Sequence, residues 1–139
     1  MIAIEDRTIH ITRGDITTGK FNRLAFYLPI YNAETKEEEK YEFELTDKIS
    51  FVVLEKKGYT KNEILRKEYT LKDLGYTEPT TVVEIPLTEE DTKKFPLLNK
   101  KATYWYDIAL NETLTILGFD DEGAKKIIAY PEGGEIDGR

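Results

Sequence analysis

Apolar residues occupy every second position along most of this chain, which is the pattern of β-strands that bury one face. Within residues Phe21–Ile30, the apolar side chains that share a face are Leu24, Phe26, Leu28 and Ile30. Ile49–Leu54 is apolar on both faces, which is typical of a central strand. The segments that we predict to be strands are Thr8–Thr12, Phe21–Ile30, Ile49–Leu54, Ile64–Tyr69, Thr80–Leu87, Ala102–Leu110, Leu114–Phe119 and Lys125–Tyr130.

Helical signals are few and short. Thr88 is a suitable N-cap because acidic residues follow it in the first turn and lysines come after them. A second helical turn is expected at Leu71–Gly75, closed by its glycine. Asn111 and Glu112 separate two predicted strands and indicate a hairpin. Many short strands without alternating helices predict an all-β fold, an antiparallel sandwich or barrel with one or two short helical turns.

The length of 139 residues is that of one domain. We expect residues 1–130 to form a single β-sandwich domain and residues 131–139 to form a flexible C-terminal tail, because the tail is rich in turn-forming residues. The segment Glu34–Glu44 is a run of charged residues between two predicted strands. We interpret it as a solvated loop or the tip of a long hairpin, with a docking surface for a basic partner as the alternative.

Composition excludes several classes of function. The chain has no cysteine and one histidine, so thiolate and histidine-rich metal sites are excluded. Its net charge of -7 argues against nucleic-acid and anionic-membrane partners. No apolar run approaches the roughly 20 residues of a membrane span, and the N-terminus lacks the features of a signal peptide. We therefore expect synthesis in the cytoplasm, with no cofactor and no metal.

Two glycine-containing motifs near the N-terminus have ordinary structural explanations. Residues Gly14–Phe21 approach a phosphate-binding loop, but Phe21 stands where the motif needs Ser or Thr. A strand pattern also follows, whereas the phosphate site needs the start of a helix. Arg13-Gly14-Asp15 matches the cell-adhesion tripeptide, yet Gly and Asp commonly make turns between strands, which is the interpretation we prefer.

No catalytic signature emerges from the remaining motifs. Asn111-Glu112-Thr113 matches the glycosylation acceptor, but the hairpin interpretation stands in a chain without a signal peptide. Asp120-Asp121-Glu122-Gly123 lacks the spacing of a calcium loop and is predicted to be a polar turn. His10 and Ser50 are single examples of their types and form no recognisable triad. We expect a protein that is not an enzyme, although the spacing of its many carboxylates neither selects nor excludes a glycosidase pair.

The densest aromatic cluster is Tyr104-Trp105-Tyr106. Alternation places both tyrosines on the face of Ile108 and the tryptophan on the other face. Burial is the usual fate of strand aromatics, and the exposed set would be covered by a neighbouring subunit or stack on a sugar. The candidate residues for contact with a partner or a sugar are Tyr104, Trp105, Tyr106, Glu37, Glu38 and Glu39.

Three stretches together resemble a known family. They are Ile9-x-Ile11-Thr12-Arg13-Gly14-Asp15, then Ile85-x-Leu87-Thr88-x-x-Asp91-Thr92, then Tyr104-x-Tyr106-Asp107-Ile108-x-Leu110 with a closing Thr115-x-x-x-Gly118-Phe119. Their order and spacing resemble the N-terminal domain of phage baseplate upper proteins and related tail or prophage proteins. The resemblance extends from about Ile9 to Phe119, and each motif taken alone is degenerate.

The resemblance implies an immunoglobulin-like β-sandwich that attaches receptor-binding apparatus to a phage tail. The chain departs from the family in the acidic insertion at Glu34–Glu44 and in an extended segment at Lys56–Tyr76. We therefore expect a non-catalytic structural or adaptor protein of the virion, in contact with other tail or baseplate proteins. Homo-oligomerisation is left open, and a carbohydrate-binding or adhesin module is the alternative function.

Overall fold

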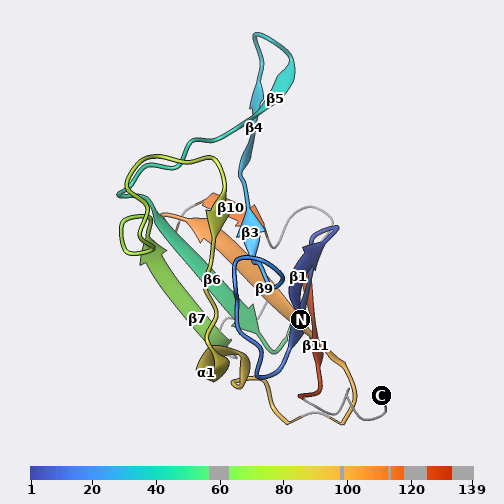
Figure 1. The fold of residues 1–139 in the computed structure, drawn as a ribbon. Helices are drawn as coiled ribbons and strands as arrows, with labels where there is room; N and C mark the ends of the chain where they lie inside the picture. Colours follow the sequence, from blue (N-terminus) through green and yellow to red (C-terminus); the bar gives the residue numbers. More distant parts are fainter. Residues whose placement is uncertain (57–62, 98, 113, 118–124, 133–139) are drawn as a thin grey trace.

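The computed structural model describes residues 1–56, 63–97, 99–112, 114–117 and 125–132, which form an all-β fold (Figure 1). The predicted turn at Asp120–Gly123, the end of the strand predicted to reach Phe119 and residues 133–139 of the tail lie outside the described residues. The elements in chain order are β1 (Ile2–Glu5), β2 (Thr8–Thr12), β3 (Ala25–Phe26), β4 (Pro29–Asn32), β5 (Glu37–Lys40), β6 (Lys48–Leu54), β7 (Glu63–Thr70), β8 (Val83–Glu84), α1 (Glu89–Thr92), β9 (Ala102–Leu110), β10 (Leu114–Leu117) and β11 (Lys125–Tyr130).

One large sheet organises the molecule, with strand order β1-β2-β11-β9-β6-β7 and with β10 paired to β9. Most of its neighbouring strands are antiparallel, as predicted. The pair β2–β11 is parallel, with Ile9 opposite Ile127 and Ile11 opposite Ala129. Parallel neighbours need a long connection, and here almost the whole chain separates the two strands. The two ends of the described chain are thereby held side by side.

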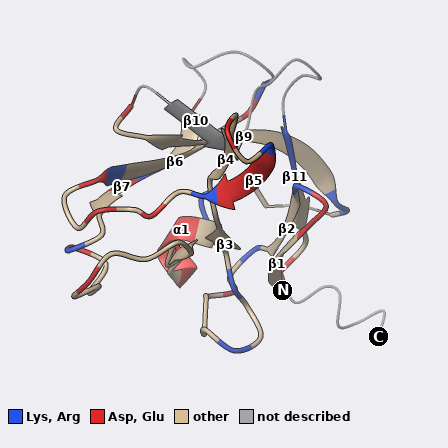
Figure 2. Cartoon of the chain, turned by 90° about the horizontal axis from the view of Figure 1, so that it is seen from above, with Lys and Arg blue, Asp and Glu red and all other residues tan. Residues whose placement is uncertain are grey.

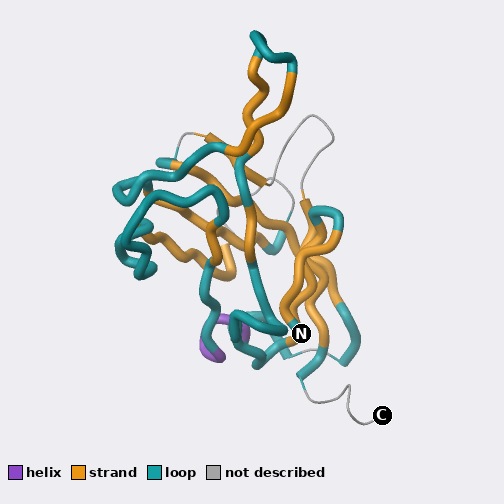
Figure 3. Tube along the Cα trace, turned by 45° about the horizontal axis from the view of Figure 1, so that its top comes forward, coloured by secondary structure: helices purple, strands orange, loops and turns teal. Residues whose placement is uncertain are grey.

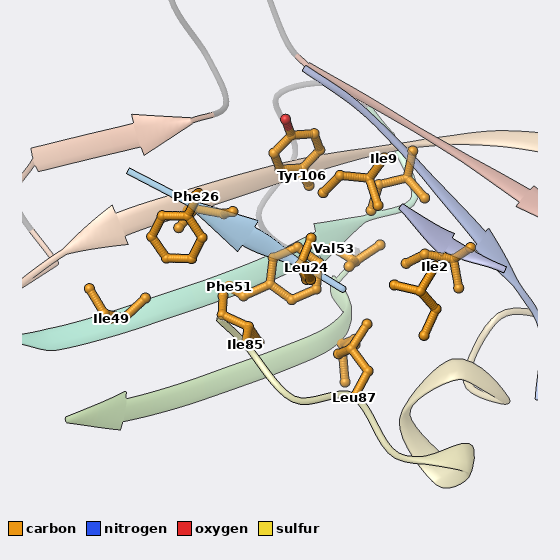
Figure 4. Packing of buried hydrophobic residues seen from close by; sticks show 14 of the residues in the cluster. Ile2, Ile9, Leu24, Phe26, Ile49, Phe51, Val53, Ile85, Leu87 and Tyr106 are labelled. Carbon is orange, nitrogen blue, oxygen red and sulfur yellow. The ribbon is translucent and has the colours of Figure 1, made fainter. Parts of the chain in front are cut away.

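A smaller layer covers one face of the large sheet. It contains the short antiparallel pair β3–β8 and a bridge between Phe43 and Thr80. Loops make up much of this layer, whereas long strands make up the large sheet (Figure 3). The two layers bury one continuous core, to which the large sheet contributes Phe51 and Tyr106 and the small layer contributes Leu24 and Ile85 (Figure 4). The arrangement is that of two packed β-layers, and its second layer is much shorter than the first.

The central strands confirm the predicted burial pattern. Tyr104, Tyr106 and Ile108 are all buried on the core face of β9. Every residue of β6 from Ile49 to Leu54 is buried, as expected for a strand with two neighbours and two apolar faces. In the small layer, alternate residues of the predicted strand Thr80–Leu87 are buried, namely Val83, Ile85 and Leu87, although only Val83–Glu84 pairs as a strand.

The short helix α1 has the predicted N-cap. The Thr88 hydroxyl accepts from the Asp91 N–H and the Asp91 carboxylate accepts from the Thr88 N–H, which together form a capping box. At Leu71–Gly75, successive turn hydrogen bonds form without an assigned helix. Gly75 has a φ of +92°, as expected for the glycine that closes such a turn.

Residues Pro29–Lys40 form a hairpin that projects from the two layers, and we call it the arm (Figure 1). The prediction of a long hairpin tip at the charge run Glu34–Glu44 is confirmed as far as Lys40. Beyond it the chain returns to the body of the molecule, where Phe43 is buried in the core.

The prediction of Phe21–Ile30 as one strand with a single buried face is only partly right. Leu24, Phe26 and Leu28 are buried, but Ile30 is 41% exposed because the chain leaves the core after Leu28.

Two strands were not predicted from the sequence. β1 pairs with β2 through a tight turn at Asp6 and Arg7, both of which have positive φ. Neither residue is a glycine, so the usual sequence signal for such a turn is absent. β5 has the sequence Glu-Glu-Glu-Lys, which has no strand propensity, and it pairs only with β4.

Candidate functional site

The arm is the most exposed part of the described molecule. All residues of its two strands are exposed except Asn32, which is half-buried. Tyr31 is 66% exposed, Ile30 is 41% exposed, and the neighbouring Tyr27 is 43% exposed. Seen from above, β5 stands out as an acidic ribbon (Figure 2). Exposed aromatic and aliphatic side chains gathered on one projection are typical of a contact surface.

Cross-strand pairing sets the chemistry of the arm. Ile30 lies opposite Glu39, Tyr31 opposite Glu38 and Asn32 opposite Glu37. The Asn32 side-chain amide donates to Glu39 at 3.2 Å. In the part of the chain that the structure describes, no ion pair involves Glu37, Glu38 or Glu39. Their charges therefore face solvent without a neutralising cation from the fold.

The base of the arm shows how a cation can bind there. The Lys40 ammonium lies over the Tyr27 ring at 4.7 Å from its centroid, in cation–π geometry. Tyr31 is the next exposed ring along the arm, and a carboxylate rather than a lysine stands opposite it. A ring next to a carboxylate is suited to a guanidinium or ammonium group from another molecule.

Asp47 anchors the arm to the large sheet. One of its carboxylate oxygens accepts from the Tyr41 hydroxyl and the Glu44 N–H, each at 2.8 Å, and the other accepts from the Asn111 amide at 3.2 Å. Burial alone would raise the pKa of Asp47, but these hydrogen bonds outweigh burial and lower it. The carboxylate thus stays ionised and links the segment that follows β5 to the start of β6 and to the β9–β10 turn.

The predicted contact residues separate into three groups. Tyr104 and Tyr106 lie in the core, where burial raises the pKa of both phenols and the Tyr106 hydroxyl donates to the Arg7 carbonyl at 2.6 Å. Neither ring is accessible, so their interpretation as contact residues is corrected. Trp105 is half-buried on the opposite face of β9, with the Lys126 ammonium 6.0 Å from its ring centroid. Glu37, Glu38 and Glu39 are exposed on the arm.

Two of the motifs behind the family resemblance meet in space. The Thr92 hydroxyl donates to the Asp15 carbonyl at 2.8 Å and accepts from the Gly14 N–H at 3.0 Å. The Arg13 guanidinium donates to the Phe95 carbonyl at 2.8 Å and to Glu132 at 2.6 Å. Arg13 is therefore engaged inside the fold, and the predicted turn role of Arg13-Gly14-Asp15 is confirmed.

A partly buried ion pair holds α1 from the side of the large sheet. The Lys67 ammonium on β7 lies 2.8 Å from the Asp91 carboxylate on α1. Burial would raise the pKa of Asp91, but the hydrogen bonds from Lys67 and from the Thr88 N–H lower it. Asp91 is therefore ionised at neutral pH, and it joins the helical turn to the large sheet.

The apolar residues on the arm and at its base are the functional candidates that sequence reasoning missed. Tyr27 and Ile30 belong to the predicted half-buried strand Phe21–Ile30, and Tyr31 lies just beyond it. Pro29 indicates that this strand ends or lies near an edge there, because proline lacks a backbone donor, but the exposure of the residues around it was not predicted. The exposure of Ile30 shows that the strand leaves the core at that proline.

The described residues contain no cluster of three or more His, Asp or Glu side chains placed to hold a metal ion. Their helical structure includes no segment long and apolar enough to cross a membrane.

Comparisons of this chain with models of protein families, with curated proteins and with solved structures find no match. The resemblance to phage baseplate proteins accordingly rests on the sequence motifs alone.

Proposed function

We propose that this chain is a non-catalytic structural or adaptor protein of a phage or prophage tail or baseplate, acting through contacts with other proteins of the virion. It would be made in the bacterial host cytoplasm and become part of the particle. The phage assignment is supported by the motif resemblance, and the mode of action is supported by the shape and exposure of the arm.

The single observation that carries the contact function is the exposed ribbon of β4 and β5. An isolated two-stranded hairpin is marginally stable in water. Here the ribbon pairs with no third strand among the described elements, yet it exposes Ile30 and Tyr31. A partner that covers the arm would bury this apolar surface and strengthen the ladder.

Charge selects the kind of partner. The arm carries the four glutamates Glu34, Glu37, Glu38 and Glu39 against the two lysines Lys36 and Lys40, within a chain of net charge -7. Identical copies therefore repel one another at long range, whereas a basic protein surface is attracted. We propose a basic tail or baseplate protein as the principal partner, and the attraction should weaken as salt rises.

The test is an assembly measurement with the intact chain and with an arm-shortened variant. In the variant, residues 30–39 are replaced by Asn-Gly, which joins the paired residues Pro29 and Lys40 by a tight turn. Light scattering with the purified products of neighbouring genes should show a complex for the intact chain and none for the variant.

A strict monomer that binds none of these products would refute the contact function. Retention of the complex by the arm-shortened variant would refute the role of the arm. Unchanged thermal unfolding of the variant is the control that its two-layered body remains intact.

A further inference from the structure

A cavity that includes no residue of the arm lies where three segments meet. It has a volume of about 320 Å³ and is lined by the turn after β7, by the loop that follows β2 and by the chain around β8. This is near the lower end of the roughly 300–1,000 Å³ range of small-molecule sites. The contacts already assigned to the arm do not include any of its residues.

The walls of this cavity combine aromatic rings with a firm apolar floor. Tyr69 and Tyr76 are half-buried in the wall, and the buried side chains of Leu24 and Ile85 close the floor. The floor is rigid because the Ile85 N–H donates to the Leu24 carbonyl at 2.9 Å and both residues belong to the core. Tyrosine rings at such a site present an apolar face together with a hydroxyl.

Two carboxylates line the cavity, and one oxygen of each accepts a hydrogen bond from the protein. Asp73 Oδ2 accepts from the Thr70 N–H at 3.1 Å, and Glu84 Oε1 accepts from the Arg23 guanidinium at 3.1 Å. In the described part of the chain, no hydrogen bond is made to Asp73 Oδ1 or Glu84 Oε2. Each side chain is thus oriented by the fold and keeps an acceptor for a ligand.

The tyrosine hydroxyl is oriented in the same way. Tyr76 Oη accepts from the Glu84 N–H at 3.1 Å, which leaves its own hydrogen to donate. The hydrogen bonds from Thr70 lower the pKa of Asp73, so this carboxylate is charged at neutral pH.

The described lining residues include no Lys, Arg or His. Two cations stand just outside the lining, because Arg23 pairs with Glu84 and the Lys67 ammonium lies 5.5 Å from the centroid of the Tyr69 ring. They offset the charge of the carboxylates, so the cavity suits a neutral polar ligand.

We propose that this cavity binds a neutral saccharide unit, with Tyr69 and Tyr76 against the sugar ring and with Asp73 and Glu84 accepting hydrogen bonds from its hydroxyls. Carboxylates suit this ligand because each can accept from neighbouring hydroxyl groups, and aromatic rings suit the C–H face of a pyranose. The site goes beyond the contact function of the arm and does not depend on it.

The test is a titration of the full chain with methyl β-glucoside, methyl β-galactoside and methyl β-N-acetylglucosaminide, followed by amide chemical shifts. At least one of these should bind with a Kd on the order of 1–10 mM, as ligand efficiency predicts for a monosaccharide. Shifts should be concentrated at residues 69–76 and 84–86.

The substitution Asp73→Asn keeps an oxygen that can accept from Thr70 but removes the charge, and it should weaken binding about tenfold. The substitution Tyr76→Phe keeps the ring and removes the donor, and it should weaken binding about threefold or more. The matched controls Glu78→Gln and Tyr130→Phe change an exposed acid and a half-buried tyrosine that do not line the cavity, and they should leave the Kd unchanged.

Three results would overturn the inference. The first is the absence of shifts with all three glycosides through the millimolar range. The second is binding that survives both cavity substitutions but is lost in Trp105→Phe, which would place the sugar on the outer face of β9. The third is binding of glucosamine cation alone, which would make the cavity a cation site. Each outcome leaves the assembly test of the arm unaffected, so the two proposals fail separately.

Discussion

Strand β9 and the arm are both regular antiparallel ladders, yet their environments are opposite. β9 pairs with β6 along one side and buries Tyr106 and Ile108 against the small layer. The arm pairs β4 with β5 and leaves Ile30 and Tyr31 in solvent. Each contains isoleucine and tyrosine, so residue type does not explain the difference. The second layer covers one ladder and stops short of the other.

This contrast shows that strand pairing and stability are separate properties. A ladder in the core gains from burial of apolar area, at roughly 25 cal/mol per Å². A ladder in solvent exchanges hydrogen bonds with water for hydrogen bonds within the chain, and gains little. We therefore expect β9 to hold the fold together and the arm to be dispensable for folding.

The largest expected effect is that of Ile108→Ala in β9. It should reduce the free energy of unfolding by about 2–5 kcal/mol, because Ile108 is fully buried and its removal leaves a cavity. The matched change Ile30→Ala on the arm should cost less than about 0.5 kcal/mol. Urea unfolding midpoints measure both. Equal losses in the two variants would show that the arm is packed in solution.

The next effect comes from the ion pair that joins α1 to the sheet. Asp91→Ala should lower the free energy of unfolding by about 1.5–3 kcal/mol. It removes charged hydrogen bonds and leaves the partly buried Lys67 ammonium without its carboxylate partner. The folded-state pKa of Asp91 is lowered, so its contribution is present above the unfolded pKa near 4 and is lost as pH falls below it. Unfolding from pH 7 to pH 2.5 should show a shallower acid dependence in Asp91→Asn than in the wild type. An identical dependence would contradict the assigned role.

A smaller effect is expected for the core tyrosine hydroxyl. Tyr106→Phe removes the donor to the Arg7 carbonyl and should cost about 1–3 kcal/mol, because the carbonyl then has one partner fewer in a partly buried site. Tyr31→Phe on the arm is the control and should be neutral. Thermal unfolding distinguishes the two, and a neutral Tyr106→Phe would indicate that water replaces the lost donor.

The smallest effect on stability, and a large effect on binding, is expected for the triple substitution of Glu37, Glu38 and Glu39 by Gln. None of these side chains pairs with a cation in the described structure, so the unfolding midpoint should stay within about 0.5 kcal/mol of wild type. Complexes with a basic partner should lose affinity and most of their salt dependence. The control is the triple change of Glu55, Glu78 and Glu90 to Gln, which alters net charge equally but lies outside the arm.

Much of the fold was predictable because burial in a sheet imposes a period of two on the sequence. β9 was predicted with its exact bounds and faces, and β6 was recognised as central from its two apolar faces. The helical turn followed from Thr88 and Asp91, which form a local motif. β1 and β5 were not predicted, because neither shows this pattern. β1 has only four residues and is followed by unusual turn residues, and β5 consists only of charged residues.

The candidate sites were less predictable, because a contact surface depends on which segments are left uncovered. The amino-acid pattern was enough to predict an acidic, strand-rich domain with Tyr106 and Ile108 on one face of a strand. The parallel pairing of β2 with β11, the departure of Ile30 from the core, and the cavity shared by Asp73 and Glu84 were visible only in the folded chain. The two kinds of feature differ in how far apart in the chain the interacting residues lie. Alternation and capping act between near neighbours in the chain, whereas pairing of distant strands and the extent of the covering layer depend on the packing of the whole molecule.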